Sequence, residues 1–359
     1  MATAELHAAE FHELDGWSED DHEAAFAAFR RSALRAATEA PKTRALGIDG
    51  TALAAITRKA LALPERPGAT LARAFFEENF VPHRVGADGF FTGYYEPEVE
   101  ARLEREPDFT VPLLRPPPEL VEVDEADPPA NLPAGMRFAR RTETGVEPFF
   151  DRGEIERGAL DGRGLEIAWL ADPVDAFFIH IQGAARLRLA DGSLLRVTYA
   201  AKSGHDYTPV GRVLLERGVL QRGNVSMQTI RAALAADPEA ARSAMWTNRS
   251  YIFFREAPVE DAALGPIAAA KVPLSTGRSL AVDRTLHTFH VPVWIETSLP
   301  EAEGGGPFHR LLIAQDTGSA IIGPARGDIF FGSGDEAGRV AGRMAAKGRF
   351  VVFVPRVSS

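Results

Sequence analysis

The chain has 359 residues, with 40 basic and 50 acidic side chains, a net charge of −10 and no cysteine. Its length predicts about two domains, and apolar and charged fractions of 45% and 25% are those of a folded globular protein. The missing cysteine excludes disulfide bonds, thiolate metal sites and cysteine nucleophiles, and the acidic balance disfavours nucleic acid as a partner.

The first region, residues 1–96, opens with helices. It begins without the basic start and apolar run of an export signal, and no stretch of the chain reaches the ~18 consecutive apolar residues of a membrane span. Apolar residues at helical spacing predict three helices, one after Ser18, one over Leu53–Leu63 and one over Leu71–Phe80. The β-type residues of Phe90–Tyr95 then predict a strand.

The second region, residues 97–243, starts with a proline-rich stretch. Nine of the 25 prolines lie between Pro97 and Pro133, and the acidic run Glu119–Asp127 lies within this stretch. The pattern indicates a linker or an extended loop rather than a packed element. Further on, Asp191 and Gly192 predict a hairpin turn between two strands. The expected strands are Ala176–Gln182, Arg186–Leu189 and Leu194–Tyr199, and the expected helices are Val210–Arg217 and Met227–Ala236.

The third region, residues 244–359, is expected to be mostly β, with one helix over Glu336–Ala346. The glycines of Gly332–Gly338 imitate a dinucleotide-binding fingerprint, but only one further strand follows them, which is too little for a βαβαβ half. We therefore interpret them as a tight strand-to-helix turn. The expected strands are Tyr251–Arg255, Leu280–Asp283, Val291–Glu296, Arg310–Asp316, Asp328–Phe331 and Phe350–Val354.

Three aspartates of the third region each lie at the border between an apolar run and a turn. Asp283 and Asp316 end predicted strands, and Asp328 opens another. If these strands share one small barrel, the three carboxyl groups converge at one end of it; the alternative is that each aspartate only caps a turn. His287 and His290 do not predict a metal site, because at this spacing on a strand they face opposite sides and a third ligand has no obvious place.

Several ordered segments give the chain a family resemblance. They are Phe91–Pro97 (FTGYYEP), Ala176–Gly183 (AFFIHIQG), Tyr199–His205 (YAAKSGH), Ser250–Glu256 (SYIFFRE) and the segment that carries the three aspartates. With them the chain resembles the membrane-bound lytic murein transglycosylases of type A. The resemblance implies a mainly β, α+β fold with flanking helices. A six-stranded double-psi β-barrel is expected from residues 1–96 plus 244–359, and a smaller inserted β domain, residues 97–243, is expected to form the other wall of a substrate groove.

The resemblance also implies an activity. The family cleaves the β-1,4 bond between N-acetylmuramic acid and N-acetylglucosamine of peptidoglycan and leaves a 1,6-anhydro end, which makes the expected enzyme an exotransglycosylase and a carbon–oxygen lyase. Because the sugar's own C6 hydroxyl closes on C1, a single aspartic acid can act as general acid and then as base, with no cofactor and no metal. Asp328 matches the family's catalytic aspartate. Asp316 is expected to position groups or stabilise charge, and Asp283 completes the catalytic set.

The resemblance further implies residues that bind the substrate. The expected substrate-binding residues are Thr92, Gly93, Tyr94, Tyr95, Gln182, Lys202, Ser203, Thr317 and Gly318. Because the net charge does not favour an anionic polymer, a locally basic groove with Arg186, Arg188 and Lys202 is also expected.

The expected partners are glycan strands of peptidoglycan and possible proteins of a wall-synthesis complex. The resemblance implies a periplasmic, outer-membrane-associated location, although this sequence shows neither an export signal nor a lipoprotein cysteine. Two other functions stay open: a hydrolase that uses Asp328 and Asp316 with water, and a wall-binding protein without catalysis. Mass spectrometry of digested peptidoglycan distinguishes the three, because they give anhydro products, products heavier by one water, or no product.

Overall fold

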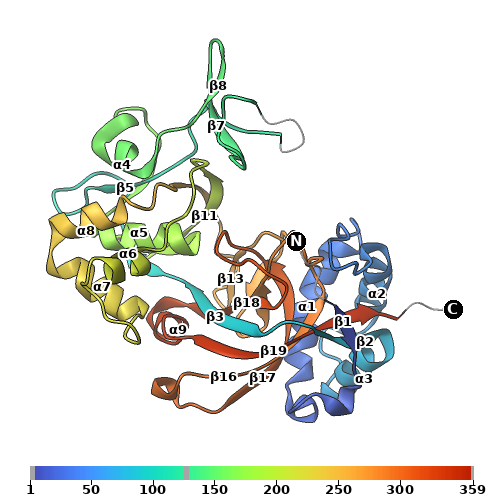
Figure 1. The fold of residues 1–359 in the computed structure, drawn as a ribbon. Helices are drawn as coiled ribbons and strands as arrows, with labels where there is room; N and C mark the ends of the chain where they lie inside the picture. The colour runs from blue at the N-terminus through green and yellow to red at the C-terminus, as the bar shows by residue number, and fades with distance from the viewer. Residues whose placement is uncertain (1–4, 125–128, 357–359) are drawn as a thin grey trace. The chain divides into compact units, whose positions relative to one another are not determined.

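The computed structural model describes residues 5–124 and 129–356. Its chain folds into two compact units, mostly β with some helices (Figure 1). The first unit comprises Met1–Tyr95 and Asp261–Ser359, and the second comprises Glu96–Glu260. The second unit ends later than the expected position 243 because β12 (Ile252–Ala257) pairs antiparallel with β11 (Leu194–Lys202) of the same unit.

The first unit combines N-terminal helices with strands from both parts of the chain. Its helices are η1 (Phe11–Glu13), η2 (Trp17–Glu19), α1 (His22–Ala36), α2 (Gly50–Ala62), α3 (Ala69–Asn79), η4 (Glu301–Glu303) and α9 (Gly334–Ala341). Its strands are β1 (Leu6–Ala8), β2 (Phe80–Val85), β3 (Gly89–Glu96), β13 (Leu264–Ile267), β14 (Pro273–Ser275), β15 (Ser279–Ala281), β16 (Pro292–Ser298), β17 (Pro307–Asp316), β18 (Arg326–Ser333) and β19 (Ala345–Pro355).

The three predicted N-terminal helices are confirmed, with one difference at the start of α1. Asp21, rather than Ser18, is the N-cap: its side chain accepts a hydrogen bond from the backbone N–H of Ala24 at 3.0 Å. Such a bond satisfies one of the free N–H groups of the first turn. Helix α1 then buries Phe26 and Phe29, and it contacts α2, α3 and β17.

Most strands of the first unit form one sheet whose pairings close on themselves, while β13 and β14 pair with each other in a separate sheet. The strand order is β1-β2-β19-β16-β17-β15-β18-β3, and β3 also pairs with β19. The strands from β19 round to β3 therefore form a ring, and the other two strands of this sheet, β1 and β2, lie outside it. The apolar core of this unit joins these strands to α1–α3, and in it the Trp17 ring packs against Trp294 and Phe353.

A buried glutamine ties α1 to the end of β17. The side-chain amide of Gln315 donates to the carbonyl of Ala28 at 3.1 Å and to the hydroxyl of Ser32 at 2.8 Å. Gln315 itself is fully buried, so these bonds replace the water that its amide would otherwise need. The next residue along β17 is Asp316, whose backbone is thereby fixed from the helix side.

The glycine-rich turn after β18 has the predicted form. Gly332 and Gly334 adopt φ values of 112° and 82°, a region that residues with a Cβ rarely occupy. They turn the chain from β18 into α9, which ends at Ala341 rather than near residue 346 because β19 already starts at Ala345.

The second unit contains a four-stranded sheet, a group of helices and two smaller sheets. Its sheet has the order β12-β11-β10-β4. Its strands are β4 (Glu98–Glu100), β5 (Val111–Leu114), β6 (Leu120–Glu122), β7 (Phe138–Thr142), β8 (Gly145–Glu147), β9 (Glu166–Leu170), β10 (Ala184–Arg188), β11 and β12. Its helices are α4 (Arg152–Glu154), η3 (Ile155–Ala159), α5 (Pro173–Gln182), α6 (Val210–Glu216), α7 (Met227–Ala236) and α8 (Pro238–Met245).

The strand predicted over Ala176–Gln182 is wrong, because this segment belongs to helix α5. Asp172 caps its first turn and Pro173 takes its first position, while Gly183 ends it in the left-handed conformation with φ 77°. The continuous apolar run is explained by burial on two sides. Ala176 and Ile179 pack in one apolar cluster of the unit, and Phe177, Phe178 and Val174 pack in another.

The proline-rich stretch is more structured than predicted. It contains β4, β5 and β6, and β5 pairs antiparallel with β9. Leu113 and Leu114 of β5 are buried, so this part is a packed element rather than a linker. Of the acidic run Glu119–Asp127, residues 125–127 lie outside the described residues. The predicted hairpin is confirmed: Gly192 lies between β10 and β11 with φ 84°.

A buried carboxylate links the start of this unit to its sheet. Both oxygens of Glu96 accept from arginines: Oε2 from Nε of Arg186 at 2.9 Å, and Oε1 from Nε of Arg196 at 2.6 Å. All three side chains are buried. The pairing offsets the loss of water around these charges, and it holds the first residue of the unit against β10 and β11.

Candidate active site

The pairing of three strands brings the three aspartates to one end of the sheet. Strand β15 runs parallel to β17 and antiparallel to β18. Ala281 of β15 is opposite both Asp316 and Asp328, and Asp283 follows two residues later. The end of β15, the end of β17 and the start of β18 therefore meet, and Asp283, Asp316 and Asp328 lie in the same place.

Strand β3 supplies a hydroxyl to two of these carboxyl groups. The Thr92 hydroxyl donates to Oδ1 of Asp328, and the Tyr94 hydroxyl donates to Oδ2 of Asp316 at 3.0 Å. Alternate residues of a strand point to the same face, so Thr92 and Tyr94 reach the carboxyl groups side by side. The two acids thus share one polar face of β3.

Asp328 has the properties of an acid that works near neutral pH. Burial raises the pKa of its carboxyl from the usual 3.8 to about 6, against the Thr92 hydrogen bond and the charge of Arg326, which lower it. The negative charge of Asp316 raises this pKa further. Asp328 nevertheless stays partly exposed, which a group that delivers a proton to a substrate needs.

Asp316 is more firmly held than Asp328. Burial raises the pKa of Asp316, while hydrogen bonds from the N–H groups of Thr317 and Ala269 and from Tyr94 lower it. The Ala269 bond reaches Oδ1 at 3.2 Å. Burial, followed by the nearby carboxylates, raises the pKa of Tyr94 well above its usual value, so Tyr94 keeps its proton and acts as a hydrogen-bond donor. The hydrogen bonds to Asp316 offset only part of the effect of its burial, so the pKa of Asp316 is raised, and Asp316 is a fixed carboxyl group with donors on both oxygens.

Asp283 anchors the two loops around the site. Its Oδ1 accepts from the N–H and hydroxyl of Thr285 at 2.9 and 2.6 Å, and its Oδ2 accepts from the N–H of Gly323 at 2.9 Å. Burial raises the pKa of Asp283, but these bonds outweigh it and hold the pKa below its usual value. His287 bonds the carbonyl of Pro324 at 2.9 Å in the same place. Residues 283–290 form turns rather than the expected β segment.

Comparisons with known proteins place this arrangement in a family. The family model described as "MltA specific insert domain" matches residues 90–255, and that described as "3D domain" matches residues 278–354. A membrane-bound lytic murein transglycosylase from Agrobacterium tumefaciens has a crystal structure that is 45% identical, covers 98% of both chains and has a TM-score of 0.91.

The chain belongs to the membrane-bound lytic murein transglycosylase A family. Its second region holds the family's insert domain, and the aspartate site lies in the segment that matches the 3D domain together with β3.

Two further relatives of the lytic murein transglycosylase A family are similar over most of the chain. The curated protein from Vibrio cholerae is 31% identical over 265 residues, which are 72% of this chain and 63% of that protein. The chain therefore spans less than two thirds of that relative's length. A structure of E. coli MltA with bound chitohexaose is 25% identical, covers 99% of this chain and 96% of that one, and has a TM-score of 0.71.

Two predicted substrate-binding residues of β3, Gly93 and Tyr95, lie in closely packed surroundings. A Cβ at Gly93 would lie 2.7 Å from the Phe331 ring and 2.8 Å from Cα of Ala341, so β3 lies close to β18 and α9 here. Tyr95 is buried, and a Cβ at Gly338 of α9 would lie 2.7 Å from its ring. The Tyr95 side chain is thus packed against α9, and its contact with substrate stays a prediction. Thr317 and Gly318, beside Asp316, are accessible.

The predicted binding residues of the second unit differ in accessibility. Gln182, at the end of α5, and Lys202, at the end of β11, are both partly exposed. Burial lowers the pKa of Lys202. Ser203 is fully buried, and its hydroxyl accepts from the N–H of Tyr251 at 3.0 Å. This bond holds the end of β11 to the segment before β12, and contact of Ser203 with substrate stays a prediction.

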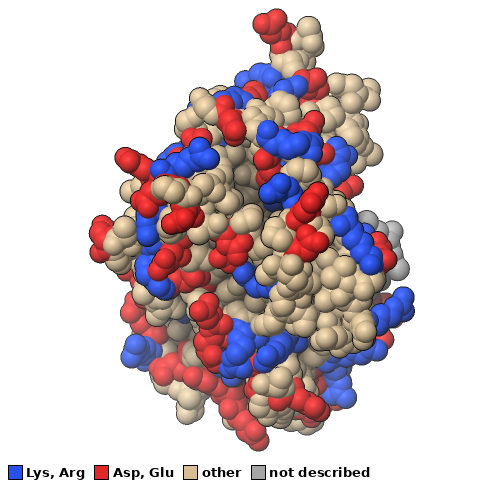
Figure 2. Space-filling model, turned by 90° about the vertical axis from the view of Figure 1, so that its left-hand side faces the viewer, with Lys and Arg blue, Asp and Glu red and all other residues tan. Residues whose placement is uncertain are grey.

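The expected basic groove is not supported either. Arg186 is buried against Glu96, and Arg188 forms an ion pair with Glu98, so neither offers a free positive charge. Figure 2 shows Lys and Arg side chains interspersed with Asp and Glu over the face in view, without a large area of one sign. Among the described residues, no cluster of three or more His, Asp or Glu side chains could hold a metal ion. No helix among them is long and apolar enough to cross a membrane.

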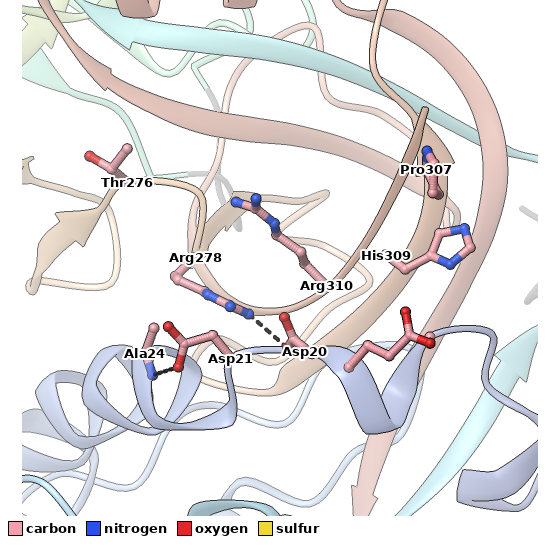
Figure 3. Close-up of a pocket in the computed structure, with 10 residues that line it drawn as sticks. Asp20, Asp21, Ala24, Thr276, Arg278, Pro307, His309 and Arg310 are labelled. Carbon is pink, nitrogen blue, oxygen red and sulfur yellow. Dashed lines mark hydrogen bonds and ion pairs between the residues drawn. The ribbon is translucent and has the colours of Figure 1, made fainter. Parts of the chain in front are cut away.

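A pocket of 460 Å³ lies near the start of β17, at the other end of this strand from Asp316 (Figure 3). It is lined by residues that include Asp20, Arg278 and Arg310 and by none of the predicted site residues. Arg278 points to Asp20 and pairs with it at 2.8 Å, and it also donates to the carbonyl of Leu311. Because Asp20 also accepts from the Leu311 N–H, this ion pair joins the N-terminal segment to β17.

Sequence reasoning missed one residue of the aspartate site, Arg326. It lies two positions before Asp328 on β18, and its guanidinium donates to the Thr92 hydroxyl at 2.7 Å. The signal was present, because residues two apart on a strand share a face. Without β3 beside it, however, the sequence does not show that this face meets Thr92.

Proposed function

We propose that the chain is a lytic transglycosylase that cleaves the β-1,4 bond between N-acetylmuramic acid and N-acetylglucosamine of peptidoglycan and leaves a 1,6-anhydro end. The observation that carries the proposal is the state of Asp328, a partly exposed residue of the three-aspartate site whose carboxyl pKa is raised to about 6 by burial. The names of the relatives, and the chitohexaose bound to E. coli MltA, support a glycan with β-1,4 bonds as the substrate.

One aspartic acid supports both halves of this reaction. Protonated Asp328 gives its proton to the glycosidic oxygen as the bond from C1 to that oxygen breaks. The positive charge that develops at C1 is stabilised by the carboxylate of Asp316, which its hydrogen bonds hold in place. The Asp328 carboxylate then takes the proton of the C6 hydroxyl while O6 bonds to C1. The acid is regenerated and no water is consumed.

Other parts of the proposal concern the fold and the setting of the reaction. We propose that the closed ring from β19 to β3 is the family's double-psi barrel, because β3 closes it by pairing with both neighbours. Gln182 and Lys202 remain predicted substrate contacts of the inserted unit. A wall polymer as substrate favours a periplasmic, outer-membrane-associated location, in line with relatives named membrane-bound. Cleavage from chain ends and a wall-synthesis complex also remain predictions.

The replacement Asp328→Asn tests the assignment of the acid. Because asparagine cannot donate this proton, we expect anhydro-muropeptides to fall at least ~10²-fold, as is typical for loss of a general acid. The measurement is mass spectrometry of soluble products from purified peptidoglycan, with binding to insoluble peptidoglycan followed by sedimentation. Asp335→Asn, at an exposed position of α9, is the matched control and should keep full activity.

The outcomes separate the candidate functions. Loss of product with retained binding supports Asp328 as the acid, whereas full activity of Asp328→Asn assigns the acid elsewhere. Wild-type products heavier by one water would indicate a hydrolase that uses Asp328 and Asp316. Binding without any wild-type product would indicate a wall-binding protein.

A further inference from the structure

A chain of hydrogen bonds leads from Arg326 through Thr92 to Asp328. Nη2 of Arg326 donates to Oγ1 of Thr92 at 2.7 Å, and the Thr92 hydroxyl donates to Oδ1 of Asp328. Arg326 and Asp328 belong to β18, while Thr92 belongs to β3. The three groups therefore lie in a row across two neighbouring strands.

The donor chemistry fixes the direction of this chain. A guanidinium only donates hydrogen bonds, whereas a hydroxyl has a single proton and can also accept. Arg326 therefore occupies a lone pair of Oγ1, and the one proton of Thr92 is directed to Asp328. Without the guanidinium, the hydroxyl is free to rotate and to accept a bond from Asp328 instead.

The backbone holds the guanidinium in this place. Nη1 of Arg326 donates to the carbonyl of Gly327 and, at 3.3 Å, to that of Phe90. The guanidinium also lies 5.2 Å from the centre of the Phe90 ring. Because its donors are directed to both strands and to Thr92, it is a fixed part of the site.

We propose that Arg326 is a positioning residue that acts through Thr92: it makes the Thr92 hydroxyl a donor to Oδ1 of Asp328, so that the acidic proton resides on Oδ2 and is delivered from there. This inference rests on the proposed function of Asp328 as general acid. Arg326 also lies beside the carboxyl as a positive charge and favours the ionised form that remains after proton transfer.

The groups that face Asp328 predict the effect of removing this charge. Thr92 and Tyr94 lie on β3, Arg326 on β18 and Asp316 on β17. Asp316 raises the pKa of Asp328, while Thr92 and Arg326 lower it. Losing Arg326 removes a positive charge and loosens the hydrogen bond from Thr92 to Asp328. Both changes favour the protonated form of Asp328, and the pKa-raising effect of Asp316 is then less opposed.

The test is the pH dependence of kcat/KM for anhydro-muropeptide formation from peptidoglycan. The limb at high pH reports the pKa of the acid in the free enzyme. For Arg326→Gln we expect this limb to shift to higher pH by about one unit. We also expect the plateau value of kcat/KM to fall about 10- to 100-fold through loss of positioning. Arg326→Lys, which keeps the charge, should leave the limb near its wild-type position.

Two controls separate this role from a general effect of charge or of folding. Arg310→Gln makes the same charge change at the exposed start of β17, and it should leave profile and plateau unchanged. Thr92→Val should also move the limb up, whereas Thr92→Ser, which restores the hydroxyl, should return it. This second pair tests the inference even if Arg326→Gln folds poorly by circular dichroism.

The inference is overturned if the limb of folded Arg326→Gln, or that of Thr92→Val, coincides with the wild-type limb. It is also overturned if Arg310→Gln moves the limb as far as Arg326→Gln. Either result leaves the proposed function standing as long as the wild-type enzyme makes anhydro products. Absence of these products from the wild type would instead contradict the proposed function itself.

Discussion

The buried environment of Asp328 affects both its acidity and the stability of the protein. The burial that raises its pKa also makes its ionised form unfavourable in the folded protein. Burial raises its pKa to about 6, above that of a carboxyl in an unfolded chain. By linkage, its contribution to stability is fully present below the unfolded pKa and is lost as the pH rises through about 6. The proposed catalytic state therefore costs stability at neutral and alkaline pH.

The replacement Asp328→Asn should expose this cost. Asparagine stays neutral, so the variant should match the wild type near pH 4 and exceed it above pH 7, by about 1 kcal/mol once the partial exposure of the site is allowed for. Thermal unfolding at both pH values measures the difference, with exposed Asp335→Asn as a control that should show none. A variant that is less stable than the wild type at pH 8 would contradict this account.

At the same scale, sequence predicts residues better when their role follows from their own segment. The aspartates could be predicted because each lies where a strand meets a turn. The burial of Ser203 and Tyr95 could not be predicted from their own segments. Ser203 is hydrogen-bonded to Tyr251, and the Tyr95 ring packs on Gly338. These partners are distant in sequence, and only the fold brings them together.

At the scale of elements, Ala176–Gln182 shows where local pattern fails. An apolar run of this length fits either a buried strand or a helix covered on all sides. The ends of the segment carried the better signal, since Asp172-Pro173 and Gly183 are typical helix boundaries. The amphipathic helices α1–α3 were predictable because each exposes one face, and the apolar period then shows directly.

The buried carboxylate of Glu96 holds the first strand residues of the inserted unit, and its loss should loosen the sheet. Glu96→Gln removes the negative charge that Glu96 places between the buried Arg186 and Arg196, which should cost about 3–5 kcal/mol. Glu98→Gln removes a neighbouring ion pair, between Glu98 of β4 and the more exposed Arg188 of β10, and should cost less than about 1 kcal/mol.

Hydrogen–deuterium exchange of peptides from β10 and β11 measures this difference within the unit concerned. Exchange should accelerate strongly in Glu96→Gln and hardly at all in Glu98→Gln. Equal exchange in the two variants would contradict the expectation that the buried ion pairs of Glu96 stabilise the sheet more than the exposed pair of Glu98.

At the scale of the whole molecule, the discontinuous unit explains how short sequence motifs far apart form one site. The site draws Thr92 and Tyr94 from the first segment and the aspartates from the last, with the inserted unit between them in sequence. The net charge is −10, and on the face seen in Figure 2 acidic and basic side chains are interspersed. Long-range attraction therefore does not explain capture of an anionic wall polymer. Local hydrogen bonds must supply recognition.

The central claim is that the sugar's own hydroxyl, rather than water, attacks C1. Digestion of purified peptidoglycan by the wild-type protein in water enriched in ¹⁸O tests it directly. As a control, a known glycan hydrolase digests the same peptidoglycan in parallel. The account predicts anhydro-muropeptides without ¹⁸O at the cleaved end. Products that carry ¹⁸O there, and that are heavier than the anhydro form by one labelled water, would contradict it.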